Sequence, residues 1–162
     1  MSQHYLVDGY NFIHHNPRLK QMIDNSLEFA RNQTIALIKG YISSRKIRVT
    51  LVFDGDDVGY VDPVFQDTSR LKIIYSNAPE KADPLIKRLI KKEKNKKSLT
   101  LVSADHELID FGKLQGAKII SPENFYHLLT KSYLIHHLDQ KYNHSLSPDE
   151  LDEWLKLFGE KK

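Results

Sequence analysis

Twice in this chain a short apolar run ends abruptly in Asp-Gly, first at Leu6-Val7-Asp8-Gly9 and again at Val52-Phe53-Asp54-Gly55. Apolar runs of this length, closed by a turn residue, are typical of strands buried in a parallel sheet. The ligand site of an open α/β sheet lies beyond the carboxyl ends of its strands. We therefore expect Asp8 and Asp54 at one functional edge, with Gly9 allowing a sharp turn.

Predicted strands alternate with predicted helices along most of the chain. Besides the two runs above, strands are expected over residues 71–76, 98–103 and 117–120, and helices over 18–45, 84–95, 106–115 and from Ser121-Pro122 onward. Ser26 is expected to divide the first helix as an N-cap. Residues 56–69 are predicted to form a loop, and His14 and His15 are interpreted as loop residues.

This alternation predicts an α/β fold with helices on both faces of a mostly parallel sheet. Right-handed crossovers favour a five-stranded sheet of order 3-2-1-4-5. Residues 1–130 are assigned to one domain, and residues 131–162 to a C-terminal helical extension packed on it. A capping-box pattern from Ser147 to Glu150 opens the last helix, in which Trp154 and Phe158 are expected to face the core.

Composition excludes several classes of protein. The chain has 162 residues and no cysteine, so neither disulfides nor thiolate metal sites are available. No apolar run approaches a membrane span, and the start lacks a signal-peptide layout. A cytoplasmic protein without a membrane partner is expected. The formal charge of +3 is compatible with an anionic partner.

Four aspartates are predicted to converge at the functional edge: Asp8, Asp54, Asp83 and Asp105. Each alone has a simpler explanation as a turn residue or a helix N-cap, above all Asp83 before Pro84. Clustered carboxylates repel one another, and a cation relieves that repulsion. Ligation by oxygen alone predicts Mg²⁺ or Mn²⁺ as the cofactor.

Two neutral side chains are predicted to support the carboxylates. Asn11 and Ser103 would orient a metal-bound water or a phosphate. The alternatives are an Asx-turn for Asn11 and a helix-cap hydroxyl for Ser103.

Four motifs together resemble the NYN domain family of PIN-like nucleases, in its YacP-like branch. They are Leu-Val-Asp8-Gly-Tyr-Asn11, Val-Phe-Asp54-Gly, Lys-Ala-Asp83 before a helix, and Val-Ser103-Ala-Asp105-His-Glu-Leu. The resemblance implies a PIN-like three-layer α/β/α fold for residues 1–130. It also implies metal-dependent RNA cleavage, with the four aspartates as metal ligands and Asn11 and Ser103 in support.

The chain departs from the family pattern at one position. Members often carry an acid one helical turn after the Ala-Asp pair, where this chain has Lys87. This departure leaves open whether one metal ion binds or two. Glu80 and Asp57 are the candidates to replace the missing acid.

A basic helix face is the candidate RNA surface. Lys87, Arg88, Lys91, Lys92 and Lys94 are expected to contact the phosphate backbone without reading sequence. The alternative is an ordinary solvated helix face. Tyr10 and Tyr60, expected near loops, are candidates to stack on unpaired bases.

These observations leave three functions to consider. The first is an endoribonuclease that hydrolyses single-stranded RNA, with mRNA as substrate and the ribosome as a further partner. The second is a catalytically weak RNA-binding or ribosome-associated module, which Lys87 would favour. The third is a Mg²⁺ phosphatase, which needs a second acid two residues after its nucleophile; Gly9 and Tyr10 follow Asp8 instead.

Overall fold

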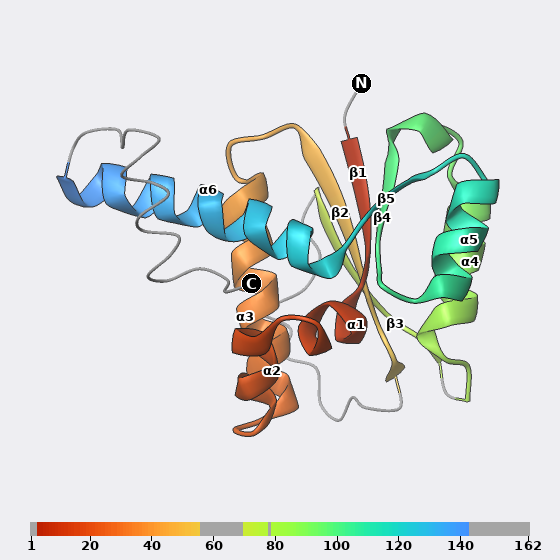
Figure 1. Ribbon diagram of the computed structural model, residues 1–162, viewed down its shortest axis with the longest axis horizontal. Helices are drawn as coiled ribbons and strands as arrows, with labels where there is room; N and C mark the ends of the chain where they lie inside the picture. Colours follow the sequence, from red (N-terminus) through yellow and green to blue (C-terminus); the bar gives the residue numbers. More distant parts are fainter. Residues whose placement is uncertain (1–2, 56–69, 78, 143–162) are drawn as a thin grey trace.

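The computed structural model describes residues 3–55, 70–77 and 79–142 of the chain (Figure 1). Its strands are β1 (Gln3–Asp8), β2 (Ile47–Phe53), β3 (Leu71–Tyr75), β4 (Leu99–Val102) and β5 (Lys118–Ile120). Its helices are α1 (Gly9–His14), α2 (Pro17–Ile23), α3 (Leu27–Ile42), α4 (Ala82–Lys92), the 3₁₀ turn η3 (Lys96–Ser98), α5 (His106–Leu114) and α6 (Pro122–Tyr142).

The predicted sheet order is confirmed. The five strands lie in the order β3-β2-β1-β4-β5, and all four neighbouring pairs are parallel. β1 is the central strand, and Asp8 at its carboxyl end is in register with Val52 of β2. The strand order reverses between β1 and β4, which is where open α/β sheets place their ligands.

Helices cover both faces of this sheet, so the predicted three-layer α/β/α architecture is also confirmed (Figure 1). One core lies under α1, α2, α3 and α6 and includes the fully buried Phe12 and Phe125. The other lies under α4 and α5 and includes Ile86 and Leu108. Strand residues alternate between the two: Tyr5 belongs to the first core and Leu6 to the second.

The segment after Asp8 differs from the predicted turn. Gly9 begins the short helix α1, and the supposed loop residue His14 is its last residue. Gly9 is required for close packing, because a Cβ there would lie 2.5 Å from the Phe53 ring and 2.7 Å from the Val52 carbonyl oxygen. Phe12 and Ile13 are both fully buried, so tertiary packing stabilises a helix too short to form alone.

Other helix boundaries fall close to the predictions. The long first helix is divided as expected, and the Ser26 hydroxyl accepts a hydrogen bond of 2.9 Å from the Phe29 backbone N–H. α4 begins at Ala82, earlier than predicted, and ends at Lys92. α6 runs without a break through residues 130 and 131, where the domain boundary was assigned. The loop over 56–69, the capping box and Trp154 and Phe158 lie outside the described residues.

No helix in the described part of the chain is long and apolar enough to span a bilayer. The two hydrophobic cores lie between the sheet and its helix layers.

We predict that Gly9→Ala lowers the free energy of unfolding by about 1–3 kcal/mol, because the added methyl group overpacks α1 against β2. The matched control is Gly40→Ala in α3, where an added Cβ meets no atom within 4 Å. That control should raise the stability by about 0.5–1 kcal/mol, since glycine weakens a helix interior. Urea denaturation of both variants measures the difference, and equal effects would contradict the packing explanation.

Candidate active site

Asp8 lies at the end of the central strand and is only 7% exposed. Along β1 it has the same side-chain direction as Leu6, which packs in the α4–α5 core. Asp8 therefore faces the side of the sheet on which α4 and α5 begin. Burial raises the pKa of Asp8 to about 7, and the negative charges of Asp83 and Asp105 contribute to the same shift.

Ser103 positions the Asp8 carboxylate. The Ser103 hydroxyl oxygen accepts a hydrogen bond of 3.1 Å from the Asp105 backbone N–H, and the hydroxyl donates one of 3.3 Å to Asp8 Oδ2. The hydroxyl thus accepts one hydrogen bond from the backbone and donates its proton to Asp8. This contact opposes the rise in the pKa of Asp8. Ser103 thus links the Asp8 carboxylate to the backbone of Asp105.

Asn11 has a positioning role that neither sequence interpretation anticipated. Its side-chain oxygen accepts a hydrogen bond of 2.8 Å from the Ala104 backbone N–H. This bond ties α1 to the connection between β4 and α5, which carries Ser103 and Asp105. Asn11 therefore holds the two halves of the site together across the point where the strand order reverses.

Asp83 is not the N-cap of its helix, contrary to the simpler explanation considered for it. Lys81 is the N-cap of α4, and Asp83 lies within the first turn. The pKa of Asp83 is raised, first by burial, then by the charge of Asp105 and a carboxyl–carboxyl hydrogen bond with it. Glu107 adds to this rise and Lys87 opposes it.

Asp105 combines a structural role with a place in the cluster. Its Oδ1 accepts hydrogen bonds from the backbone N–H groups of Glu107 (2.9 Å) and Leu108 (3.3 Å), so it caps α5 as the simpler explanation predicted. Its negative charge also raises the pKa values of Asp8 and Asp83. The structure thus brings Asp8, Asp83 and Asp105 together.

Asp54, the fourth predicted carboxylate, has a lysine beside it. It follows β2 and forms an ion pair with Lys81, with 3.7 Å between Asp54 Oδ2 and Lys81 Nζ. Its backbone is tightly fixed, because a Cβ on the next residue, Gly55, would lie 1.8 Å from the Ser76 carbonyl oxygen. The Ser76 hydroxyl also accepts a hydrogen bond of 2.9 Å from the Gly55 N–H.

Sequence reasoning missed two charged residues at this edge. Lys81 neutralises Asp54, and Glu107 pairs with Lys87 at 3.2 Å between Oε2 and Nζ. Glu80, a candidate to replace the missing acid, instead forms a two-pronged pair with Arg88. Asp57 lies outside the described residues. The acid beside Lys87 is therefore Glu107, and no sequence signal identifies it, because the pair depends on how α4 packs against α5.

The residues expected to contact RNA differ in which side chains surround them. Lys87 and Lys91 lie over the Phe111 ring of α5, at 5.7 and 5.8 Å from its centroid. Tyr10 lies in α1 rather than in a loop: its ring packs on Phe53 at 4.8 Å between centroids, and its hydroxyl accepts a hydrogen bond from the buried Arg31. This packing leaves the Tyr10 ring half-buried.

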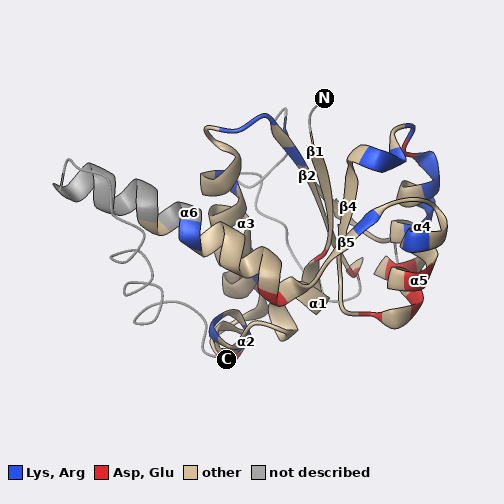
Figure 2. Cartoon of the chain, turned by 45° about the horizontal axis from the view of Figure 1, so that its top comes forward, with Lys and Arg blue, Asp and Glu red and all other residues tan. Residues whose placement is uncertain are grey.

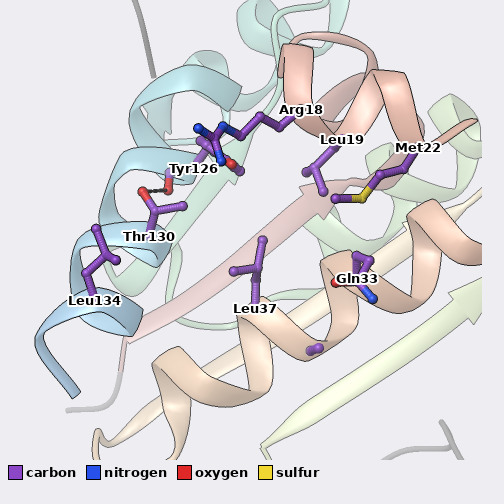
Figure 3. Close-up of a pocket in the computed structure, with 9 residues that line it drawn as sticks. Arg18, Leu19, Met22, Gln33, Leu37, Tyr126, Thr130 and Leu134 are labelled. Atoms are coloured by element: carbon purple, nitrogen blue, oxygen red, sulfur yellow. Dashed lines mark hydrogen bonds between the residues drawn. The ribbon is translucent and has the colours of Figure 1, made fainter. Parts of the chain in front are cut away.

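An apolar cavity of about 450 Å³ lies elsewhere, between α2, α3 and α6 (Figure 3). Leu19, Met22 and Leu37 line it, with Arg18 at its rim. These helices cover the opposite face of the sheet from Asp8. The cavity is therefore separate from the candidate active site.

The family model for the YacP-like NYN domain matches residues 5–158. The chain belongs to this family. It is a family of PIN-like nuclease domains, which supports a nuclease or RNA-related role. The match extends over nearly all of the chain and includes every residue of the acidic edge described above.

Solved and curated relatives agree with this assignment. Two crystal structures of Rae1 (YacP) from Bacillus subtilis, one of a point mutant, superpose with TM-scores of 0.72 and 0.71 at 27% and 26% identity. The two superpositions include 88% and 94% of this chain, and 80% and 89% of the respective Rae1 chains. The uncharacterized protein YacP from Bacillus subtilis strain 168 is 38% identical over 84 residues, or 52% of this chain. That match spans about half (49%) of the relative's length.

We predict a pH-dependent stability difference between the wild type and Asp8→Asn, measured without metal. A carboxyl group whose pKa rises from 3.8 to about 7 on folding stabilises the native state fully below pH 3.8 and loses that contribution as the pH rises through 7. Asparagine resembles the protonated form at every pH. The variant should therefore match the wild type near pH 4 and exceed its stability by up to about 4 kcal/mol at pH 8.

Asp110→Asn in α5 is the matched control, because Asp110 is exposed and does not contribute to the raised pKa values of Asp8 and Asp83. Its stability should follow that of the wild type over the same range. Urea denaturation at pH 4, 6 and 8 measures all three proteins. A constant difference between wild type and Asp8→Asn would contradict the raised pKa.

Proposed function

We propose that this protein is a divalent-metal-dependent endoribonuclease that cleaves single-stranded RNA, with mRNA as its substrate, in the cytoplasm. The observation that carries the proposal is the meeting of Asp8, Asp83 and Asp105 where the strand order reverses, with Asp8 almost withdrawn from water. Such mutual repulsion is relieved by a cation. Membership of the YacP-like NYN family supports nuclease chemistry at this edge.

The donor chemistry fits Mg²⁺ or Mn²⁺. Carboxylate and hydroxyl oxygens meet at the site, and hard cations prefer such ligands. In the described part of the chain, no three or more His, Cys, Asp or Glu side chains are grouped so that they would hold a metal ion by themselves. Mg²⁺ is commonly held by one or two carboxylates together with substrate phosphates and water. The proposed ion is of that kind.

Asp8 and Asp83 would hold the ion, supported by Asp105 and by Asp54 from the adjacent strand. A bound ion would neutralise the carboxylates and polarise a phosphate oxygen. Ser103 keeps Asp8 oriented, and Asn11 keeps the β4–α5 connection in place.

A second candidate is a catalytically weak RNA-binding or ribosome-associated module. The observation that favours it is the charge neutralisation at the edge of the site, where Lys81 pairs with Asp54 and Lys87 with Glu107. Lysines so placed substitute for part of a cation's charge. Retained RNA binding together with absent metal-dependent cleavage would favour this module over the nuclease.

We predict that Asp8→Asn lowers the rate of Mg²⁺-dependent cleavage of single-stranded RNA by a factor of about 100 or more, because it removes the most buried carboxylate of the site. EDTA should abolish cleavage by the wild type. Gel analysis of an end-labelled RNA measures both effects, with Asp110→Asn as the control that keeps wild-type activity. Undiminished cleavage by Asp8→Asn would overturn the proposed function.

We also predict that millimolar Mg²⁺ or Mn²⁺ raises the melting temperature of the wild type more than that of Asp8→Asn. A ligand that binds only the folded state stabilises it by mass action. The increase should grow when a non-cleavable single-stranded RNA analogue is added, because its phosphate completes the coordination shell. Equal metal-induced shifts in both proteins would place the metal elsewhere.

A further inference from the structure

A second polar surface lies on the same face of the sheet as Asp8. It is a groove of about 310 Å³ between the outer part of the sheet and the carboxyl-terminal end of α4. We call it the basic groove. Its lining residues are His4, Leu6, Arg48, Thr50, Lys72, Ile74, Leu89, Lys92, Glu93, Lys94 and Leu99.

We propose that the basic groove binds the phosphate backbone of a single-stranded RNA whose continuation reaches the carboxylates. Four cations line it, Arg48, Lys72, Lys92 and Lys94, against the single carboxylate of Glu93. The inference rests on the proposed function for the identity of the ligand. It assigns a substrate-binding role to Arg48 and Lys72, which lie on strands, outside the basic helix.

The one acid of the groove is neutralised from within. Glu93 Oε2 lies 2.9 Å from His4 Nδ1 and 4.0 Å from Arg48 Nη2, and Glu93 Oε1 accepts a hydrogen bond from the Asn95 N–H. Although burial works against it, these contacts lower the pKa of Glu93. The other ring nitrogen of His4, Nε2, lies 2.8 Å from the Thr50 hydroxyl. Glu93 is thus paired with His4 and Arg48 of the two strands, and the three lysines are exposed.

The cations of α4 and of the segment directly after it fall into separate groups, and one of these groups belongs to the groove. Lys92 and Lys94 line it. Lys87 and Lys91 lie on the side of α4 that faces α5, over the Phe111 ring. Arg88 is paired with Glu80. The basic helix is therefore not a uniform RNA surface, and the groove side is the part that combines a cavity with lysines for which no acidic partner is seen among the described residues.

The register of the sheet leads from the groove to the carboxylates. Ile74, which lines the groove, is in register with Val52, and Val52 is in register with Asp8. His4 and Asp8 are four residues apart on β1, a separation of about 13 Å along the strand. Figure 2 shows the two charges at opposite ends of this region: basic residues gather where α4 ends, and acidic residues where the strands end and over α5.

The test compares two double variants that lose the same charge. Lys72→Gln with Lys92→Gln removes two groove cations, and Lys20→Gln in α2 with Lys113→Gln in α5 removes two exposed lysines that do not line the groove. The probe is a fluorescein-labelled oligouridylate of about 12 nucleotides, titrated in EDTA so that cleavage cannot interfere. Fluorescence anisotropy gives the dissociation constant over a series of salt concentrations.

The groove variant should bind more weakly by a factor on the order of ten at 0.1 M salt. Its plot of log affinity against log salt should be shallower by about 1.4, since each lost single-strand phosphate contact removes about 0.7. The control variant should keep the wild-type slope. Equal losses in both variants, or no loss in the groove variant, would overturn the assignment of the groove.

Cleavage assays on the same proteins separate this inference from the proposed function. If the groove variant binds like the wild type while the wild type cleaves RNA, the groove assignment fails and the nuclease stands. If the groove variant loses binding while the wild type never cleaves, the groove assignment stands and the nuclease fails. Circular dichroism melting of both double variants verifies that each is folded at the assay temperature.

Discussion

The burial of one carboxylate at the end of the central strand is the constraint on which this structure depends. β1 has strands on both sides and helices on both faces, so the group that ends it is almost withdrawn from water. An ionised carboxylate in that position is strongly disfavoured unless hydrogen bonds or a cation compensate. Ser103 supplies one hydrogen bond, and Asn11 fixes the connection that carries Ser103. The neighbouring carboxylates act in the opposite direction and leave a site suited to positive charge.

The sheet order could be predicted because it depends on long-range rules that the sequence displays openly. Alternating strands and helices, short connections and right-handed crossovers leave few arrangements for five strands. The placing of Asp8 and Asp105 at the point of reversal follows from that order. Helix α1 could not be predicted, because Gly9 and the aromatic residues after it favour a turn or a strand. Only the burial of Phe12 and Ile13 against the sheet makes that segment helical.

The environment of Asp83 shows a second limit of sequence reasoning. Asp-Pro matches an N-cap followed by the first helical residue. Pro84 is equally tolerated deeper in the first turn, because backbone N–H groups there have no partner within the helix and proline, which lacks an N–H, loses no hydrogen bond. The structure uses the second possibility, and Asp83 is freed to face Asp105. Likewise, no spacing rule could show that Glu107, rather than Glu80, lies beside Lys87. That outcome depends on how α4 packs against α5.

The two charged regions on the Asp8 face of the sheet act oppositely on a polyanion such as RNA. The basic groove attracts phosphates over the range of a Debye length, about 8–10 Å at moderate salt. The acidic edge, about 13 Å away along β1, repels them. A divalent cation at that edge reverses the sign of the local charge and removes the repulsion. RNA held only by the groove would remain outside the carboxylates, so metal and substrate are expected to promote each other's binding. Reciprocal coupling of this kind is a thermodynamic necessity whenever one ligand changes the affinity for another.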